Sequence, residues 1–323
     1  MKLVKRVAAV LGALVAVAVL LVGVKFYALS PNERPPQEVK VPSSPEAIER
    51  GRYLANHVAV CMGCHSEVDP DLPGEPIRPG RLGSGRDFGA DAGFPGHMRA
   101  PNLTPDPETG IGNWTDGQLL RAMREGIGRD GHVLFPFMPY PTYAKLLSDS
   151  DAHAIIAYLR SLPPIKNAVA KTTVNFPVSM LIRALPEPVT TPAAAAPTDP
   201  LGRGKWLLSM GNCHDCHDAF NAQHQPLPGR ELSGGFEFAS PSGKGSVFAS
   251  NITSDKATGV GAYTDEDLLR VFNEGTNKAG RKLYVMPWAH YAGMTDDDKR
   301  ALIAALRQVP PVSNPVKAPT LAR

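Results

Sequence analysis

The first apolar stretch of the chain is VAAVLGALVAVAVLLVGV, which runs from Val7 to Val24 without a charged residue. Lysine and arginine side chains precede it, and Lys25 follows it. A helix of this length rises roughly 27 Å, which is close to the thickness of a bilayer's hydrocarbon core. Residues 1–30 are therefore predicted to form an N-terminal transmembrane anchor with its positive flank in the cytoplasm.

A cleavable signal peptide is the alternative interpretation of the same segment. Ala28 and Ser30 are small residues that suit a cleavage site, but the apolar run is longer than in most signals and Pro31 would follow the cut. Both interpretations place the chain from residue 30 onward on the exported side. The anchored form predicts an inner-membrane protein that contacts the lipid bilayer through its N-terminal helix, with the rest of the chain in the periplasm.

Apolar positions beyond the anchor recur with helical spacing. The stretch SSPEAIERGRYLANHVAV has a serine and a proline that are typical of a helix start, followed by one apolar stripe. The stripe consists of Ile48, Gly51, Leu54, Ala55 and Val58. Two further stretches, DSDAHAIIAYLRSL and DDDKRALIAALRQV, are amphipathic and each ends at a proline pair.

Local signals mark where several helices begin. Ser148 and Thr295 are placed to cap the two closing helices. Two middle helices are predicted after N-caps formed by Thr115 with Gln118 and by Thr264 with Asp267. The only strand signal is GFEFASPSGKGSVFASN, which predicts a small hairpin around Ser242 to Gly245.

The whole pattern occurs twice. APNLTPDPETGIGNWTDGQLLRAMREG aligns with ASNITSDKATGVGAYTDEDLLRVFNEG, so that Asn102 pairs with Asn251 at an offset of 149. The offset is 152 at the cysteines and 147 near the ends, as expected for a duplicated unit whose loops differ in length. The predicted parts are module 1 (42–166), a linker (167–198), module 2 (199–313) and a tail (314–323).

The linker has two halves of different character. Its second half is rich in Pro, Ala and Thr, as in a semi-rigid spacer. Its first half is more apolar and is expected either to pack against module 1 or to contact the membrane or a partner. The apolar residues are Phe176, Val178, Met180, Leu181 and Ile182.

Composition limits the function classes. The 323 residues carry 34 basic and 31 acidic side chains, a net charge of +3, so no basic surface indicates nucleic acid as a partner. Proline (32) and glycine (30) together indicate many turns and long loops around a modest amount of regular structure. The hydrophobic content of 43% is nevertheless enough to build cores.

The four cysteines occur as two CxxCH motifs at equivalent places in the repeat. They are Cys61, Cys64 and His65 in CMGCH, and Cys213, Cys216 and His217 in CHDCH. This pattern is the attachment signature of c-type haem, in which two thioethers fix the porphyrin and the histidine is the proximal iron ligand. The prediction is therefore two covalently bound haem c groups.

Other uses of paired cysteines remain as alternatives. A four-cysteine zinc site would have to draw on both modules and has no need of the histidines. A thioredoxin-like redox pair requires a βαβ context that the sequence lacks. Structural disulfides suit an exported protein but do not account for a histidine after each pair.

The repeat also selects the sixth iron ligand. Of nine methionines, Met138 and Met286 fall at equivalent places downstream of the cysteines, and each precedes a proline. The thioether of methionine raises the reduction potential of a haem that only shuttles electrons. The equivalent aromatic residues Trp114 and Tyr263 are candidates for hydrogen bonds to haem propionates, with assistance from the equivalent arginines Arg121 and Arg270, or they simply pack and face solvent.

The motifs CMGCH, NLTPDPETGIGNWTD and FPFMPYPTY, repeated as CHDCH, NITSDKATGVGAYTD and YVMPWAHY, resemble the multihaem cytochrome c subunits of periplasmic alcohol and gluconate dehydrogenases. The resemblance covers both modules. It implies an all-α fold of two tandem class I cytochrome c domains with long Gly/Pro-rich loops. Members of the family usually carry three haem modules, whereas this chain has two.

The resemblance implies periplasmic electron transfer without substrate chemistry. The expected partners are a membrane-associated dehydrogenase subunit or a quinol-oxidising complex on the donor side, and an oxidase or a soluble cytochrome as the respiratory acceptor. A dihaem cytochrome c peroxidase is the alternative, although a methionine in both copies argues against the displaceable sixth site that peroxide reduction requires. A structural or haem-storage role is the third interpretation.

Overall fold

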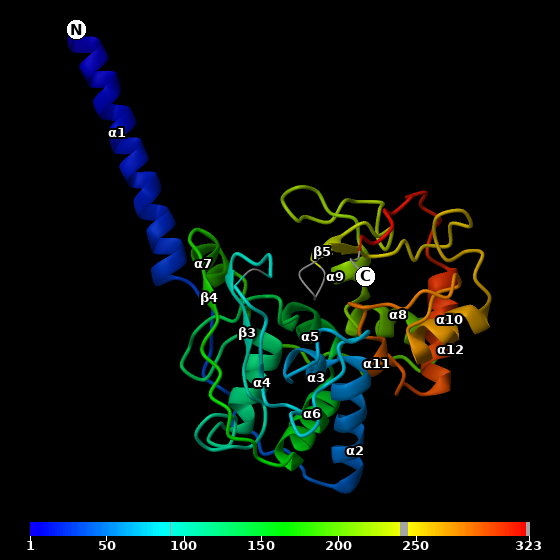
Figure 1. Cartoon of the computed structure of the whole chain (residues 1–323). Coiled ribbons are helices and arrows are strands. Elements are labelled where there is room, and N and C mark those ends of the chain that lie inside the picture. Colours follow the sequence, from blue (N-terminus) through cyan, green and yellow to red (C-terminus); the bar gives the residue numbers. More distant parts are fainter. Residues whose placement is uncertain (91, 240–244, 321–323) are drawn as a thin grey trace.

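Helices supply nearly all of the regular structure in the computed structural model, which describes residues 1–90, 92–239 and 245–320. The expectation of an all-α fold is confirmed. Helix α1 (Lys2–Gly23) continues into a π-helical turn (Val24–Ala28) and projects away from the rest of the chain (Figure 1). The segment Lys2–Ala28 is long and apolar enough to cross a membrane, with a mean hydropathy of 2.9 and no buried residue.

Module 1 contains five helices among its described residues. They are α2 (Pro45–Tyr53), which continues through a π-helical turn (Leu54–Val58), α3 (Cys61–Cys64), α4 (Asp116–Glu125), α5 (Tyr140–Leu146) and α6 (Asp149–Ser161). The stripe predicted on α2 is confirmed, since Leu54, Ala55 and Val58 are fully buried. They face the core because their spacing places them on one side of the helix.

Module 2 repeats this arrangement. Its helices are α8 (Pro200–Met210), α9 (Cys213–His217), α10 (Asp265–Glu274), α11 (Trp288–Tyr291) and α12 (Asp296–Arg307). Thr264 caps α10 by accepting a hydrogen bond from the Asp267 amide, and Thr115 caps α4 through Gln118 in the same way, so both capping predictions are confirmed. Thr295 caps α12 as predicted.

In each module the first and last helices cross at a glycine. A Cβ atom on Gly51 of α2 would lie 1.8 Å from the carbonyl oxygen of Ala154 on α6. A Cβ atom on Gly204 of α8 would lie 1.9 Å from the carbonyl oxygen of Ala301 on α12. Only a residue without a side chain allows the backbones to approach this closely.

Short antiparallel strand pairs stabilise the loops. Strand β1 (Arg86–Asp87) pairs with β3 (Arg99–Ala100), and β2 (Gly96–His97) pairs with β4 (Thr173–Val174). The predicted hairpin of module 2 is confirmed by β5 (Glu237–Ala239) and β6 (Ser246–Phe248), although Ser242 lies outside the described residues. The ladder within module 1 and the ladder that joins the linker to it had no sequence signal because each strand has only two residues.

The segment after residue 166 packs on module 1. Beyond β4 it forms α7 (Val178–Leu181) and a 3₁₀ turn (Ile182–Ala184). Ile182 is buried, whereas Phe176 and Leu181 are exposed. The residues between the anchor and α2 also pack here, since Arg34 pairs with Glu125 of α4 at 2.8 Å.

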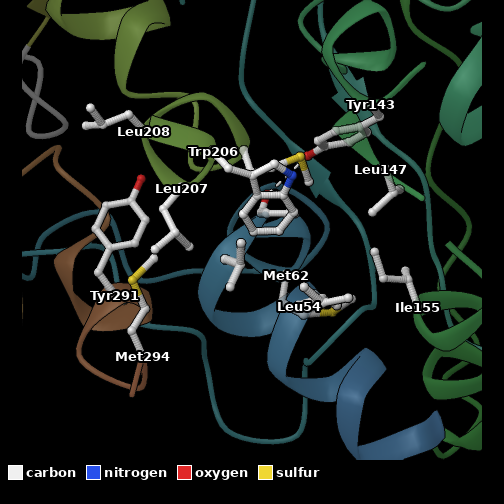
Figure 2. Close-up of a cluster of buried hydrophobic side chains, with 14 of the residues drawn as sticks. Leu54, Met62, Tyr143, Leu147, Ile155, Trp206, Leu207, Leu208, Tyr291 and Met294 are labelled. Atoms are coloured by element: carbon white, nitrogen blue, oxygen red, sulfur yellow. Dashed lines mark hydrogen bonds between the residues drawn. The ribbon is translucent and has the colours of Figure 1, made fainter. Parts of the chain in front are cut away.

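One continuous hydrophobic core joins the two modules (Figure 2). Trp206 of α8 lies at its centre, with Tyr143 and Leu147 of module 1 on one side and Tyr291 and Leu207 of module 2 on the other. The two modules are therefore expected to keep a fixed arrangement and not to move independently, because separating them would expose this core to water.

The hydrogen bonds across this interface have pseudo-two-fold symmetry. Trp206 Nε1 of module 2 donates to the carbonyl of Leu146 at 3.0 Å. At the position equivalent to Trp206 in module 1, the hydroxyl of Tyr53 accepts a hydrogen bond from the Thr295 amide at 3.3 Å and donates to Asp298 at 2.5 Å. Equivalent positions of both copies thus contact each other's closing segments, as in an isologous dimer interface.

Candidate haem sites

Each cysteine pair lies on a single helical turn that begins abruptly. Helix α3 follows Val60 at φ 51° and α9 follows Asn212 at φ 55°, so the chain enters both turns from the left-handed region. The amide of Gly63 then bonds to the Val60 carbonyl at 3.0 Å. Residues three apart on one turn lie on the same side, which brings the two sulfurs of each pair to one face.

The thiols show no sign of a redox or zinc role. All four cysteines are free, and burial raises the pKa of Cys61, Cys213 and Cys216 to about 12 and also raises that of Cys64. A redox-active thiol needs a lowered pKa, because the thiolate is the nucleophile. Within the described residues no three His, Cys, Asp or Glu side chains form a group that could hold a metal ion.

Both motif histidines are held with one ring nitrogen free for a metal. His65 Nδ1 lies 2.8 Å from the carbonyl of Pro101, and His217 Nδ1 lies 2.7 Å from that of Ser250. A carbonyl can only accept, so Nδ1 carries the proton and Nε2 keeps its lone pair. This is the orientation that metal-bound histidines adopt. Burial lowers the pKa of both rings, which favours the neutral form that a metal ligand requires.

The two methionines are held by the same turn. Pro139 has φ −80° and ψ 48°, and Pro287 has φ −79° and ψ 48°. Both Met138 and Met286 are half-buried against the hydrophobic core. The sequence prediction that the two residues are equivalent is thus matched by their backbone geometry.

A buried tyrosine ties each methionine loop to the cysteine motif. Tyr143 donates to the carbonyl of Ala59 at 3.2 Å, and Tyr291 donates to the carbonyl of Gly211 at 2.8 Å. Each acceptor lies two residues before a cysteine pair, and each tyrosine lies five residues after a methionine. These tyrosines fix the distance between the loops that would hold opposite axial ligands, a role that sequence analysis missed although the two residues are equivalent in the repeat.

A buried asparagine in each module forms hydrogen bonds that hold the loop next to the carbonyl partner of the motif histidine. Asn102 accepts from the Thr104 amide and donates to the carbonyl of Ile165, and Asn251 makes the same bonds to Thr253 and Val312. The network joins the loop that follows the histidine's carbonyl partner to the end of the module. Its repetition explains why asparagine and threonine recur at these places.

Ionisable groups of the two attachment motifs lie close enough to influence each other across the module interface. The carboxyl of Asp215 and the neighbouring thiol of Cys64 both add to the burial that raises the pKa of Cys216. Cys64 likewise adds to the factors that raise the pKa of Tyr291, after burial and the thiols of module 2. Residues near both haem attachment points therefore share one electrostatic environment.

The equivalent aromatic residues pack alike in both modules, whereas the equivalent arginines differ in their partners and exposure. Trp114 and Tyr263 pack against the core, and their carbonyls accept hydrogen bonds from Arg160 and Arg307. Arg121 is buried and donates to the carbonyl of Gly128 at 2.9 Å. Arg270, its equivalent, pairs with Asp267 at 2.8 Å and is more exposed.

Two histidines that have no equivalent in the other copy lie at the module interface. His290 is buried and its Nδ1 lies 3.1 Å from the carbonyl of Asn56, while His57 Nδ1 lies 2.8 Å from the carbonyl of His290. Each imidazole is thus held by a backbone carbonyl of the other module.

Comparison with known proteins agrees with this geometry. Residues 48–163 match the family model of cytochrome c. They form a cytochrome c domain. The cofactors of the chain are two haem c groups, one for each CxxCH motif.

Relatives of the cytochrome include subunits of larger enzymes. The chain is 29% identical to the cytochrome c subunit of a quinone-dependent alcohol dehydrogenase from Gluconobacter oxydans, over 82% of this chain and 55% of the relative. It is 30% identical to the gluconate 2-dehydrogenase cytochrome c subunit of Pantoea cypripedii, over 77% of this chain and 54% of that subunit. The chain thus spans about half the length of these relatives.

A shorter relative matches over most of its length. The chain is 28% identical to a dihaem c-type cytochrome from Cereibacter sphaeroides, over 78% of this chain and 82% of that protein. The chain is homologous to both kinds of cytochrome, and it shares the two-haem content with the shorter one.

Proposed function

We propose that this chain is a membrane-anchored dihaem cytochrome that relays electrons in the periplasm. The donor would be a membrane-associated dehydrogenase subunit or a quinol-oxidising complex. The acceptor would be an oxidase or a soluble cytochrome of the respiratory chain. The anchor is assigned to residues 1–30 and the two haem domains to modules 1 and 2 as defined above.

The proposal assigns each ligand. Thioethers would form at Cys61, Cys64, Cys213 and Cys216. The proximal ligands would be His65 and His217, and the distal ligands Met138 and Met286. When bound between histidine and methionine, the haem iron takes up and releases single electrons without opening a site for substrate.

One observation carries this assignment. In both copies the motif imidazole, buried in His65 and half-buried in His217, donates through Nδ1 to a carbonyl at an equivalent position, Pro101 or Ser250, which leaves Nε2 to bind iron. A zinc, disulfide or thiol-redox role for the cysteines gives no reason to orient a histidine in this way. A peroxidase would need the two modules to differ at the distal position, whereas the turns around Met138 and Met286 are the same.

The module interface favours electron transfer within the chain. The shared core fixes the two attachment motifs relative to each other, so the path between them does not depend on diffusion of one module toward the other. Tyr143 and Tyr291 are both buried beside the motifs and hold the surrounding loops. The chain's own role is thus to position two redox centres and to keep water away from them.

Contacts at the end of α1 support a retained anchor rather than a cleaved signal. Arg183 donates to the carbonyls of Phe26 and Ser30, both at 2.7 Å. Cleavage near residue 28 or 30 would break these contacts between the apolar segment and the folded part of the chain.

The ligand assignment is tested with full-length protein extracted in mild detergent. A haem assay on the denatured protein should give two haems for each chain, and acid extraction should leave them attached. Carbon monoxide should not bind to the fully reduced protein, because both sixth positions are occupied. Rapid peroxide turnover, or carbon monoxide binding to one of the two haems, would instead favour the peroxidase.

Copurification tests the partners. Solubilised membranes should yield the cytochrome together with a dehydrogenase subunit or a quinol-oxidising complex, and the isolated assembly should reduce both haems when its substrate or a quinol is added. Absence of reduction by any membrane donor would favour haem storage.

A further inference from the structure

Several exposed large apolar side chains lie near the C-terminal end of the anchor helix. Beyond residue 24, eight such side chains are exposed in the described part of the chain, and five of them lie near the junction of α1 with module 1. We call these five the interfacial patch; they are Tyr27, Leu29, Phe176, Leu181 and Leu185. Phe176 is 73% exposed and Leu29 is 70% exposed, so neither is part of the protein core.

The patch comes from two distant parts of the sequence that lie side by side. Figure 1 shows α7 next to the C-terminal end of α1, and the structure places it in contact with the π-helical turn Val24–Ala28. Leu181 ends α7 and Leu185 follows the next 3₁₀ turn, and both side chains are exposed.

Arg183 fixes α7 to the end of the anchor. Its guanidinium donates to the carbonyls of Phe26 and Ser30 and lies 5.7 Å from the centre of the Tyr27 ring. The last carbonyls of a helix lack partners within the helix and carry partial negative charge, so a cation there is favourable. This contact places α7 at the level where α1 leaves the apolar region.

The chemistry of the patch matches a membrane surface. Aromatic and leucine side chains next to cations are typical of segments at the boundary between headgroups and acyl chains. Lys25 and Arg183 supply the cations, and each has a long stem that can lie along apolar groups while its charge stays in water. The patch also continues the apolar surface of α1, none of whose residues is buried in the protein.

The patch is joined rigidly to the first haem site. The amide of Asn175, next to Phe176, bonds to the carbonyl of Pro95 at 2.8 Å, and β4, directly before Asn175, pairs with β2, directly after Pro95. Phe94 lies beside them, and its ring is 4.7 Å from that of Phe137, which adjoins Met138. A surface held against the bilayer here would therefore orient the methionine loop of module 1 as well.

We propose that the interfacial patch lies in the headgroup region of the lipid bilayer and holds module 1 in one orientation against the membrane. This inference rests on the retained anchor of the proposed function. It adds that module 1, not module 2, is the half fixed to the lipid surface. The single helix α1 would otherwise leave the haem domains free to swing about residues 29–31.

The test uses photo-crosslinking in native membranes with the full-length holoprotein. Benzoylphenylalanine is placed singly at Phe176 and at Leu181, and at Leu72 and Leu201 as exposed apolar controls distant in sequence from the patch. A fifth probe at Val15 reports on the anchor. After illumination, mass spectrometry should find phospholipid adducts at Val15, Phe176 and Leu181, and none at the two controls.

The outcomes separate the two proposals. Adducts at Val15 but not at Phe176 and Leu181 would overturn the patch and leave the anchor intact. Absence of adducts at Val15 would overturn the anchor, and the patch with it, while haem content and reduction still report on electron transfer. Adducts of Phe176 and Leu181 with a polypeptide would show that a protein, not lipid, covers this surface.

A second measurement tests orientation. Linear dichroism of the haem bands in oriented bilayers of phosphatidylethanolamine and phosphatidylglycerol should show a fixed haem tilt for the native protein. The double variant Phe176→Glu with Leu181→Glu should lose much of this dichroism while keeping its absorption spectrum. Leu201→Glu should retain the dichroism, and equal loss in both variants would contradict the proposal.

Discussion

Modules 1 and 2 share a scaffold but differ in the charges beside the haem attachment points. Ser66 directly follows the motif histidine in module 1, and its hydroxyl accepts a hydrogen bond from the Gly83 amide at 2.9 Å. Asp218 is its equivalent in module 2, and its carboxylate accepts from the Leu232 amide at 2.8 Å. The same loop is closed in both copies, once by a neutral group and once by a buried acid.

The residues inside the motifs also differ in their capacity for charge. Met62 is fully buried in the core of module 1, whereas His214 of module 2 pairs with Asp218 at 2.9 Å, and that hydrogen bond raises the pKa of the imidazole. The duplication thus preserved the geometry that orients ligands and varied the charges around them. Geometry decides whether iron can be held, and charge decides how readily it is reduced.

Removing either methionine that we propose as a distal ligand has the largest expected effect on this comparison. Met138→Ala should open one haem and Met286→Ala the other, so each variant should bind carbon monoxide at half the haems. The potential of the altered haem should fall on the order of 0.1 to 0.2 V, because the thioether favours ferrous iron. Spectra and redox titration measure both effects. Met98→Ala, a buried methionine with no repeat partner, serves as the control and should bind none.

Adding a methyl group at the two helix crossings should have the next largest effect, which is a loss of stability. Gly51→Ala and Gly204→Ala each force a methyl group into a backbone carbonyl and should each lower the free energy of unfolding by about 3 kcal/mol. Because the modules share one core, both variants should shift the same single transition in denaturant, followed by circular dichroism. Lys205→Ala, exposed on α8, should change stability little. Two separate transitions would show that the modules unfold independently.

Exchanging Ser66 and Asp218 between the modules tests whether their charge sets a difference in reduction potential between the two haems. A negative charge stabilises the ferric state, so Asp218→Ser should raise the potential of the haem in module 2 and Ser66→Asp should lower that of module 1. Coulomb's law at an effective dielectric constant of about 20 gives shifts on the order of tens of millivolts. Redox titration of both haems measures them, with the exposed Asp297→Ser as control. The idea fails if either exchange moves the potential in the opposite direction.

Removing the two equivalent interface donors should have the smallest effect. Tyr53→Phe deletes two hydrogen bonds across the modules and Trp206→Phe deletes one, and the loss should cost about 1 kcal/mol of unfolding free energy for each bond near pH 7. Their pH dependence should differ. Burial opposes ionisation of Asp298, but hydrogen bonds from Arg203 and Tyr53 outweigh it and hold the pKa of this carboxyl below its usual value.

The sign of that dependence follows from the lowered pKa. The carboxylate contributes stability above the pKa it has when unfolded, about 4, and loses it as the pH falls through the folded pKa. The deficit of Tyr53→Phe should therefore be complete above about pH 5 and shrink at lower pH. The hydrogen bond from Trp206 to the Leu146 carbonyl joins two neutral groups, so the loss of stability in Trp206→Phe should not change with pH. Denaturant unfolding between pH 3 and 7 measures both, and parallel curves would contradict the assignment.

Much of each candidate site could be predicted from sequence because its signals are local. The CxxCH motifs, the Met-Pro pairs and the caps at Thr115 and Thr264 depend on residues within a few positions of each other. The repeat then identified equivalent residues without any knowledge of distances. Tyr143 and Tyr291 were within reach of the same reasoning, but an aromatic residue on an amphipathic helix has no pattern that separates a buried hydroxyl from ordinary packing.

The duplicated helical modules, the two haem attachment motifs and the apolar N-terminal helix can all be recognised from the sequence alone, since periodicity and spacing are properties of short stretches. The shared core around Trp206, the contact of His57 with His290 and the binding of Arg183 to the end of the anchor are visible in the folded chain alone. The reason is physical. An apolar stripe records that a face must be buried, but which surface buries it depends on the summed contacts of segments far apart in the chain.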